Sequence, residues 1–260
     1  MVTQHLQSKV CFESARYRGL QLTATSSRRF CLTIKGLPHK TVWVEYPDIE
    51  ALCKKLGARP TSKKPDGWPL YTLPVISAPN TGAIVADSAA IARYLDRTYP
   101  DARTLIPKGA DALTAAFDHA FWGTAGGPAF FCVMMARMVA LLNPRSATYI
   151  REARAEMLGL NAGVGEGLEE LRKGLHRITE EWLEADGREK VFVMGDEVGV
   201  TYADIILASF LLWVQKSFGE ESREWKGVLE WDGGRWAKLL AKFEKHHEVD
   251  DGEELKLEAL

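Results

Sequence analysis

The sequence lacks several features that would assign it to a specialised class of protein. Its four cysteines never form a C-x-x-C pair, which favours free thiols in a reducing compartment over a disulfide framework. Apolar runs of membrane-spanning length are missing, since Arg137 breaks the best one, around residues 128–142. The N-terminus has no cationic segment followed by an apolar run, as a secretory signal would. These absences predict a cytoplasmic protein.

An excess of charge of either sign is missing as well. The formal net charge is -2, so neither a nucleic acid nor an anionic membrane is an expected partner. Histidine, cysteine and carboxylate residues do not cluster at metal-ligand spacing, so no metal is expected. A chain of 260 residues with 46% hydrophobic and 26% charged residues can instead form one large globular domain or two smaller ones.

The first hundred residues predict a small α/β unit. KTVWVEY alternates as a strand does, while SSRRFCLTIKGL and DIEALCKKLGA carry helix start and stop signals. The predicted order is a helix at 26–37, a strand at 40–46, a helix at 48–58, a loop at 58–69, strands at 71–76 and 83–86, and a helix from 87 that ends before 99. A further strand at 19–23, within an irregular N-terminal run, would complete the order of a thioredoxin-like domain.

Two features of this unit suggest a binding site for a small peptide. A proline inside the apolar run LPVI has no N–H for a strand ladder, and a cis bond at Pro74 would leave Val75 able to pair with an extended peptide. Asp87 and Ser88 open a helix, where free N–H groups attract a carboxylate and Asp87 can accept from an ammonium. Alone, Pro74 could simply end a strand and Asp87 could simply cap a helix; together they favour peptide binding.

These segments resemble a known family. LPVI followed by ADSAAIARYL is similar to the glutathione-site signature of cytosolic glutathione transferases, and SSRRFCLTIKGLPHKTVWVE resembles their first helix and second strand. VFVMGDEVGVTYADIILASFLLW resembles a family segment in which a capping box opens a buried helix; here Thr201 and Asp204 form the box. WVEYPDIEALCKKLGA and FWGTAGGPAFFCVMMA resemble the fungal etherase-like class, which is related to bacterial lignin β-etherases.

The resemblance implies an α/β thioredoxin-like N-terminal domain followed by an all-α helical domain, the glutathione transferase fold. We expect a glutathione-binding domain at 1–100 with 1–20 irregular, a linker at 101–108, a helical domain at 109–247 and an acidic, mobile tail at 248–260. Apolar spacing predicts helices at 111–143, broken at Gly126-Gly127-Pro128, and at 145–158, 167–185, 201–218 and 234–247.

The resemblance also implies two ligand sites. The glutathione-binding residues are expected to be Leu73, Pro74, Val75, Asp87, Ser88 and Lys64, with Lys64 (or Lys63) facing the glycine carboxylate. The site of the apolar co-substrate is expected to include Phe117, Phe121, Trp122, Phe130 and Met134, of which about half could instead be core or dimer contacts. Phe210 and Trp213 are expected to be core residues.

The catalytic hydroxyl is harder to place. The family activates the glutathione thiolate with a Ser, Tyr or Cys at the start of the first helix, but the matching positions here are Leu22 and Ala24, which cannot donate. Ser26 and Thr25 are the best catalytic candidates, although either could simply cap the helix. Cys31 falls inside that helix and is expected to be a buried apolar residue.

Three functions follow from these expectations. The first is a glutathione transferase, expected to be a homodimer, that moves the glutathione thiol onto hydrophobic aromatic electrophiles or cleaves aryl ethers or peroxides. The second is a binding protein of the same fold that carries aromatic ligands with little or no catalysis, which the unusual residues at 22 and 24 favour. The third, a dimerisation scaffold that binds no glutathione, is disfavoured by the intact LPVI and ADS segments.

Overall fold

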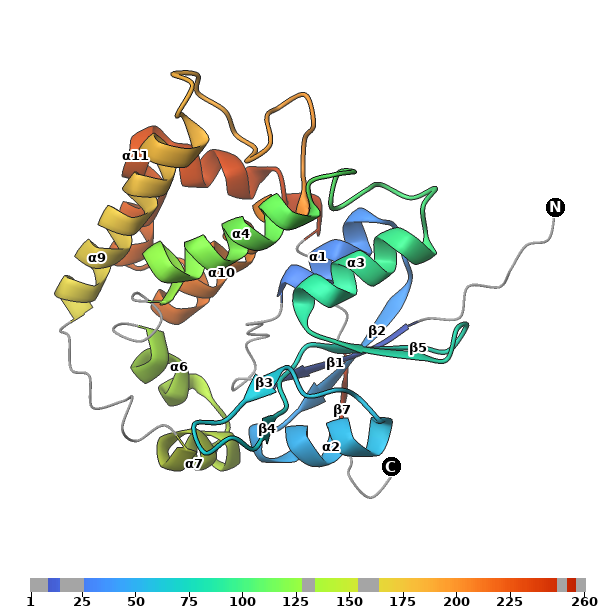
Figure 1. Cartoon of the computed structure of the whole chain (residues 1–260). Helices are drawn as coiled ribbons and strands as arrows, with labels where there is room; N and C mark the ends of the chain where they lie inside the picture. Colours follow the sequence, from blue (N-terminus) through green and yellow to red (C-terminus); the bar gives the residue numbers. More distant parts are fainter. Residues whose placement is uncertain (1–8, 15–25, 128–133, 154–163, 247–251, 256–260) are drawn as a thin grey trace. The chain divides into compact units, whose positions relative to one another are not determined.

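A computed structural model describes residues 9–14, 26–127, 134–153, 164–246 and 252–255 (Figure 1). The chain divides into two compact units. The N-terminal unit comprises Met1–Thr104 and His246–Leu260, and the helical unit comprises Leu105–Lys245. The thioredoxin-like and helical parts expected from the sequence are both present.

A five-stranded sheet forms the centre of the N-terminal unit, with α1 and α3 on one face and α2 on the other (Figure 1). Its strand order is β6-β5-β1-β2-β7, with β1 parallel to β2 and antiparallel to β5. The strands are β1 (Lys9–Ser14), β2 (His39–Val44), β5 (Val75–Ala78), β6 (Ala83–Ala86) and β7 (Glu253–Glu254). The helices are α1 (Ser26–Ile34), α2 (Ile49–Leu56), which follows a 3-10 turn at Tyr46–Asp48, and α3 (Ser88–Thr98).

The first strand is not where the sequence suggested. β1 occupies Lys9–Ser14 inside the segment predicted to be irregular, and it is the central strand of the sheet. The predicted strand at 19–23 lies outside the described residues. The sequence KVCFES has a low strand propensity by itself because it includes a lysine, a glutamate and a serine. Pairing on both sides, with β2 and with β5, supplies the stabilisation that local propensity does not.

The core under α2 explains why β2 and β5 hold this helix. Ile49, Leu52 and Cys53 of α2 are buried against Val44 of β2 and Val75 of β5. Each fully buried aliphatic side chain contributes about 1.5–3 kcal/mol. The left-handed conformation of Gly57, with φ of 73°, then ends α2.

Two other segments of this unit differ from expectation. The predicted loop at 58–69 contains a small hairpin of β3 (Ser62–Lys63) and β4 (Pro69–Leu70). The acidic tail was expected to be mobile, but β7 extends the sheet by parallel pairing of Glu253 and Glu254 with Val42 and Trp43. Both pieces are only two residues per strand, too short to show a sequence period.

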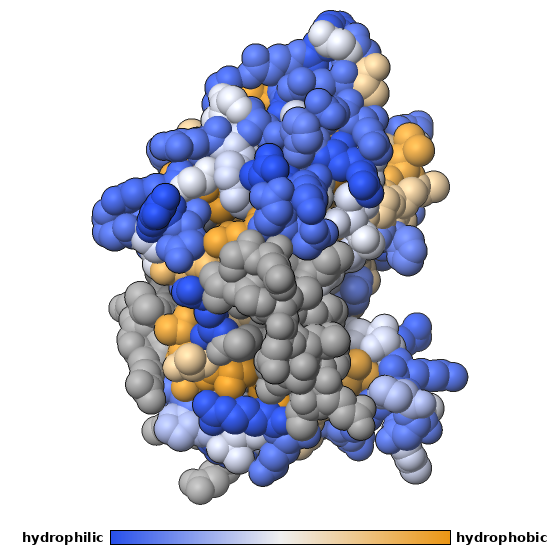
Figure 2. All heavy atoms as spheres, turned by 90° about the vertical axis from the view of Figure 1, so that its left-hand side faces the viewer, coloured by the Kyte–Doolittle hydropathy of each residue, from blue (hydrophilic) through white to orange (hydrophobic). Residues whose placement is uncertain are grey.

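The helical unit is built from α4 (Asp111–Phe121), α6 (Met135–Leu141), α7 (Pro144–Ala153), α9 (Val164–Arg177), α10 (Tyr202–Phe218) and α11 (Arg223–Ala241). π-helical turns extend α4 at Trp122–Gly126 and α9 at Ile178–Leu183, and a 3-10 turn follows at Glu244–His246. In the described parts of the chain, no helix has the length and apolarity needed to cross a bilayer. Figure 2 looks onto the side of α9, where hydrophilic residues dominate the upper part of the view.

The central helix α10 and its capping box are confirmed. Most of its residues are buried, as an almost wholly apolar helix requires. Asp204 is fully buried, and its carboxylate accepts hydrogen bonds of 2.7 Å from Thr201 N–H, the Thr201 hydroxyl and Val193 N–H. Burial raises the pKa of Asp204 to about 6, against the hydrogen bonds, which lower it.

Glycine residues explain two features of the helical unit. At the π-turn after α4, a side chain on Gly174 of α9 would lie 2.8 Å from the main chain of Ala125, so only glycine permits this approach. The last helix was predicted at 234–247, but α11 begins at Arg223 and is interrupted at Trp231–Gly234. Asp232, Gly233 and Gly234 take up left-handed conformations there, which the Asp-Gly-Gly sequence allows.

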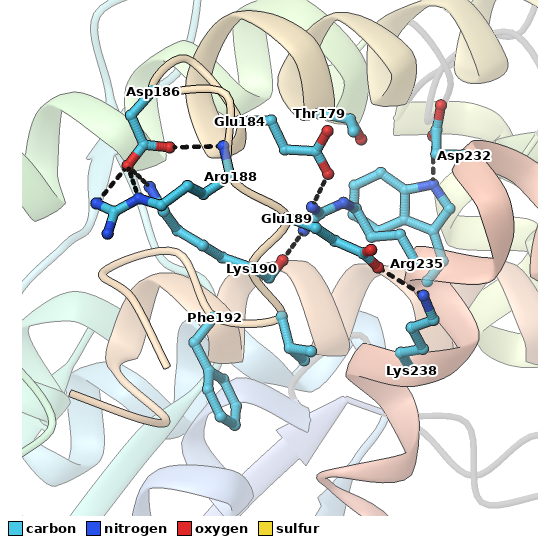
Figure 3. A network of polar contacts seen from close by, with 12 residues as sticks. Thr179, Glu184, Asp186, Arg188, Glu189, Lys190, Phe192, Asp232, Arg235 and Lys238 are labelled. Carbon is cyan, nitrogen blue, oxygen red and sulfur yellow. Dashed lines mark hydrogen bonds and ion pairs between the residues drawn. The ribbon is translucent and has the colours of Figure 1, made fainter. Parts of the chain in front are cut away.

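Arg235, just after that break, anchors the connection between α9 and α10 (Figure 3). Its buried guanidinium donates to the Glu184 carboxylate and to the main-chain carbonyl of Lys190. Lys238 reaches the same connection through an ion pair of 2.6 Å with Glu189. The network fixes the segment that leads into the capping box of α10.

Candidate functional site

The helices α1 and α3 lie side by side and run in the same direction. At their N-terminal ends, the Ser27 hydroxyl donates to Ser88 Oγ over 3.3 Å. At their C-terminal ends, the fully buried Lys35 forms an ion pair of 2.8 Å with Asp96 and also donates to the carbonyl of Arg103. The two contacts therefore bring the two positive helix ends together at one corner of the N-terminal unit.

The N-terminus of α3 offers donors to an anion. Asp87, at φ of 80°, caps the helix by accepting from Ala90 N–H over 2.9 Å. Within the described residues, the main-chain N–H groups of Ser88 and Ala89 have no hydrogen-bond partner. Together with the Ser88 hydroxyl, they form a site that suits a carboxylate. Asp87 is exposed, and only one of its two carboxylate oxygens is used in the cap.

The peptide bond between Leu73 and Pro74 is cis, as the sequence suggested. The predicted role of Val75 needs a correction. Asp87 N–H donates to the Pro74 carbonyl over 3.2 Å, and alternation along an antiparallel ladder turns the polar groups of Val75 the other way, toward Phe12 of β1. Val75 is thus inside the sheet on both sides and cannot pair with a separate peptide.

Leu73 is the residue whose main chain remains available. The ladder between β5 and β1 ends at the pair of Val75 and Phe12. Within the described part of the chain, the main-chain N–H and C=O of Leu73 have no hydrogen-bond partner. An extended peptide could therefore pair with Leu73 as an added strand.

The predicted lysine lies in the β3–β4 hairpin. Lys64 forms an ion pair of 3.1 Å with Glu50 of α2, which also binds Lys54 at 2.7 Å. Its two lysine partners, Lys54 first, lower the pKa of Glu50. Lys63 is exposed. The assignment of Lys64 to a ligand carboxylate stays a prediction, and that carboxylate would compete with Glu50.

The catalytic candidates are only partly within the described residues. Ser26 is the first residue of α1, whereas Thr25, Leu22 and Ala24 lie outside the described residues. Ser26 and Thr25 therefore remain predictions. Cys31 is fully buried, as expected, and this burial raises the pKa of its thiol far above the ordinary value. Such a thiol remains protonated and does not compete as a nucleophile.

The predicted co-substrate residues differ in exposure. Phe121 and Met134 are fully buried, while Trp122 is 43% exposed and contacts Phe121 edge-on at 5.6 Å. Phe117 is half-buried, and its ring centroid lies 5.8 Å from that of Trp182. Phe130 lies outside the described residues. Trp122 thus offers the most accessible aromatic surface among the described members, and the assignment of the set to a co-substrate stays a prediction.

Phe210 and Trp213 were expected in the core, and both are buried. The ring centroid of Phe210 lies 5.2 Å from that of Phe121 and 6.1 Å from that of Trp122, so Phe210 packs edge-on against the ring of Trp122. Among the residues that the structure describes, histidine, cysteine and carboxylate side chains form no group able to hold a metal ion.

Sequence reasoning missed one residue of this corner, Ser27, and gave the pairing role of Leu73 to the nearby Val75. Ser27 was not among the expected site residues, yet its hydroxyl contacts Ser88. Nothing in the local sequence distinguishes it from Ser26, because the contact joins residues 61 positions apart. Leu73 was among the expected glutathione-binding residues, but its main chain was not expected to be the pairing partner, because that role depends on the register of β1, which the sequence did not place.

Comparisons with known proteins agree with this geometry. Residues 28–98 match a family model described as the glutathione S-transferase N-terminal domain, and residues 112–246 match the C-terminal domain of the same family. Glutathione transferase GSTFuA3 from Phanerochaete chrysosporium is 43% identical, covers 94% of this chain and 99% of its own, and superposes with a TM-score of 0.87.

Two further relatives extend the comparison. The glutathione S-transferase CsGST63524 of Ceriporiopsis subvermispora, solved in complex with glutathione, is 42% identical over 95% of this chain and 100% of its own, with a TM-score of 0.88. The glutathione S-transferase-like protein ustS of Aspergillus flavus is 27% identical over 81% of this chain and 79% of its own.

Proposed function

This chain belongs to the glutathione S-transferase family, and on that premise we propose that it binds glutathione and transfers its thiol to hydrophobic aromatic electrophiles. The observation that carries the proposal is the corner at the N-terminus of α3, where the donors of Ser88 and Ala89 lie open beside the helix start of α1. The glutathione-bound relative from Ceriporiopsis supports the choice of ligand.

Each end of the tripeptide has a chemical match at this corner. The α-carboxylate of the γ-glutamyl residue accepts from the N–H groups of Ser88 and Ala89 and from the Ser88 hydroxyl. Its ammonium binds the oxygen of Asp87 that the helix cap leaves unused. The cysteinyl residue pairs with the main chain of Leu73. The glycine carboxylate is assigned to Lys64, which exchanges Glu50 for the ligand.

The N-terminus of α1 is proposed to activate the thiol. A free thiol with a pKa of about 8.5 is mostly protonated at neutral pH, and lowering it to about 6.5 needs roughly 2.7 kcal/mol. A helix N-terminus contributes up to about 2 kcal/mol in a favourable geometry. A hydroxyl hydrogen bond from Ser26 or Thr25 supplies the rest. The thiolate then attacks the electrophilic carbon, a carbon–sulfur bond forms, and the leaving group departs with its bonding electrons.

The aromatic residues of the helical unit are proposed to select the electrophile. Trp122 presents exposed ring surface held by Phe121 and Phe210, and such surface suits flat hydrophobic compounds, including aryl ethers.

We also propose that the chain forms a homodimer. Light scattering on the purified chain tests this, and a monomeric mass would contradict it.

A binding protein with little or no catalysis is the second candidate. It is favoured by the residues at the two positions where the resemblance places the activating hydroxyl, because Leu22 and Ala24 cannot donate a hydrogen bond. Glutathione binding is common to both functions, so only turnover separates them.

The test combines retention on immobilised glutathione with turnover of an activated aryl halide. A transferase binds and raises the rate above the uncatalysed conjugation; binding without rate enhancement selects the second candidate, and no binding overturns both. Replacing the activating hydroxyl, in Ser26→Ala or Thr25→Ala, should lower kcat/KM roughly tenfold or more. Thr104→Ala, which removes an exposed hydroxyl elsewhere, is the control and should retain the wild-type rate.

A further inference from the structure

We infer that Ser27 is a positioning residue that aims the hydroxyl of Ser88 at the γ-glutamyl carboxylate of bound glutathione. The inference rests on the proposed function and assigns a role to a residue outside the predicted site. Its basis is the contact in which the Ser27 hydroxyl donates to Ser88 Oγ over 3.3 Å, with Ser27 only 9% exposed.

The direction of this hydrogen bond follows from the protons available. A hydroxyl has one proton to donate and can accept from others, whereas a carboxylate can only accept. When the carboxylate lies on the N-terminus of α3, the single proton of Ser88 must point to it. The contact between the two serines must then use the proton of Ser27. Binding of the carboxylate therefore fixes the order Ser27 to Ser88 to ligand.

The same count of protons separates Ser27 from the activation of the thiol. Once the proton of Ser27 is committed to Ser88, it is not available for the glutathione sulfur. Ser27 therefore contributes to affinity for the carboxylate, while the hydroxyl that stabilises the thiolate must come from a different residue, for which Ser26 and Thr25 are the candidates.

The scaffold keeps this contact in register without the ligand. Lys35 and Asp96 pin the far ends of α1 and α3 through an ion pair of 2.8 Å, and Lys35 is fully buried. Both contacts join residues 61 positions apart, so α1 and α3 keep the same register from one contact to the other. The Lys35–Asp96 pair is remote from the helix N-termini, so it provides a purely structural control.

The experiment measures dissociation constants of two ligands by calorimetry on the full chain. S-methylglutathione carries the carboxylate but no ionisable thiol. Its analogue with 4-aminobutyryl in place of γ-glutamyl lacks only that carboxylate. Ser27→Ala should weaken S-methylglutathione roughly three- to tenfold and leave the analogue unchanged. Ser27→Thr, which keeps a hydroxyl, should restore the affinity.

Two controls separate positioning from a loss of structure. Asp96→Asn should lower the Tm while leaving the ratio of the two dissociation constants at its wild-type value. In a Ser88→Ala background, Ser27→Ala should have no further effect, because the hydroxyl it orients is gone.

Several results would overturn the inference. Equal weakening of both ligands by Ser27→Ala, or no weakening of either, contradicts a role in orienting Ser88. So does unchanged affinity for S-methylglutathione accompanied by a raised thiol pKa in bound glutathione, which would make Ser27 the thiolate donor. If the wild-type chain binds neither S-methylglutathione nor glutathione, the proposed function fails as well; normal wild-type binding with an ineffective Ser27→Ala overturns this inference alone.

Discussion

Removal of the Asp204 carboxylate should destabilise the helical unit strongly. Asp204 is fully buried and accepts three hydrogen bonds of 2.7 Å, two from Thr201 and one from Val193. Asp204→Ala leaves the two donors of Thr201 buried without a partner, at about 1–3 kcal/mol each. Relief of the buried charge offsets part of this cost. We expect the free energy of unfolding to fall by about 2–4 kcal/mol at pH 8.

The loss of stability caused by Asp204→Ala should be larger at low pH than at high pH. Burial raises the pKa of Asp204 to about 6, above its ordinary value of 3.8, so the folded state binds the proton more tightly than the unfolded state. The stability that this group contributes is therefore fully present below pH 3.8 and is lost as the pH rises through about 6. The effect of Asp204→Ala should grow by about 1 kcal/mol between pH 8 and pH 5.

Urea unfolding followed by circular dichroism at both pH values measures these effects. Asp196→Ala is the matched control, because this exposed carboxylate also accepts two main-chain hydrogen bonds, from Val191 and Phe192. Its loss should cost less than about 1 kcal/mol, since water can replace it. An Asp204→Ala penalty as small as the control, or one that shrinks toward pH 5, would refute this reasoning.

Three further predictions concern the packing of helices. Gly174→Ala should destabilise the chain by about 1–3 kcal/mol in urea unfolding, because its side chain would meet main chain at 2.8 Å. Gly227→Ala, at a helical glycine with nothing within 4 Å, should instead stabilise it by up to about 1 kcal/mol; equal effects would contradict the close approach. The Asp232 carboxylate, 2.8 Å from His176 Nδ1, raises the pKa of His176, so Asp232→Asn should lower that pKa in an NMR titration, and an unchanged value would contradict the pairing. The stability from this ion pair should be complete below pH 6.5 and lost as the pH rises through the raised pKa. Lys35→Met removes the ammonium of a buried ion pair and should cost about 3–5 kcal/mol; a Tm equal to the wild-type value would show that the pair is not buried.

Strong local signals in the sequence were sufficient for much of this fold. The helix signals of α2, α3 and α10 are local and periodic, and their bounds agree with prediction to within a few residues. The capping box of Thr201 and Asp204 needs only residues three apart, so its spacing is visible in the sequence. The resemblance to glutathione transferases rested on segments of this kind.

Contacts between distant residues were beyond the reach of these signals. β1 is held by pairing with β2 and β5 rather than by its own composition. Its position decides that Leu73, not Val75, has a main chain without a hydrogen-bond partner among the described residues. The break in α11 depends on three successive left-handed residues around Asp232. Asp-Gly-Gly permits that conformation without requiring it, and the prediction at 234–247 found only the part of α11 that follows the break, not the part that begins at Arg223.

Calorimetric titration of glutathione into the wild-type chain and into Ser88→Ala tests the central claim most directly. The account predicts saturable binding of one glutathione per chain, weakened roughly tenfold or more when the hydroxyl that donates to the carboxylate is removed. A wild-type chain that gives no binding heat, or a Ser88→Ala variant that binds as tightly as the wild type, would contradict the assignment of the α3 N-terminus as the glutathione site.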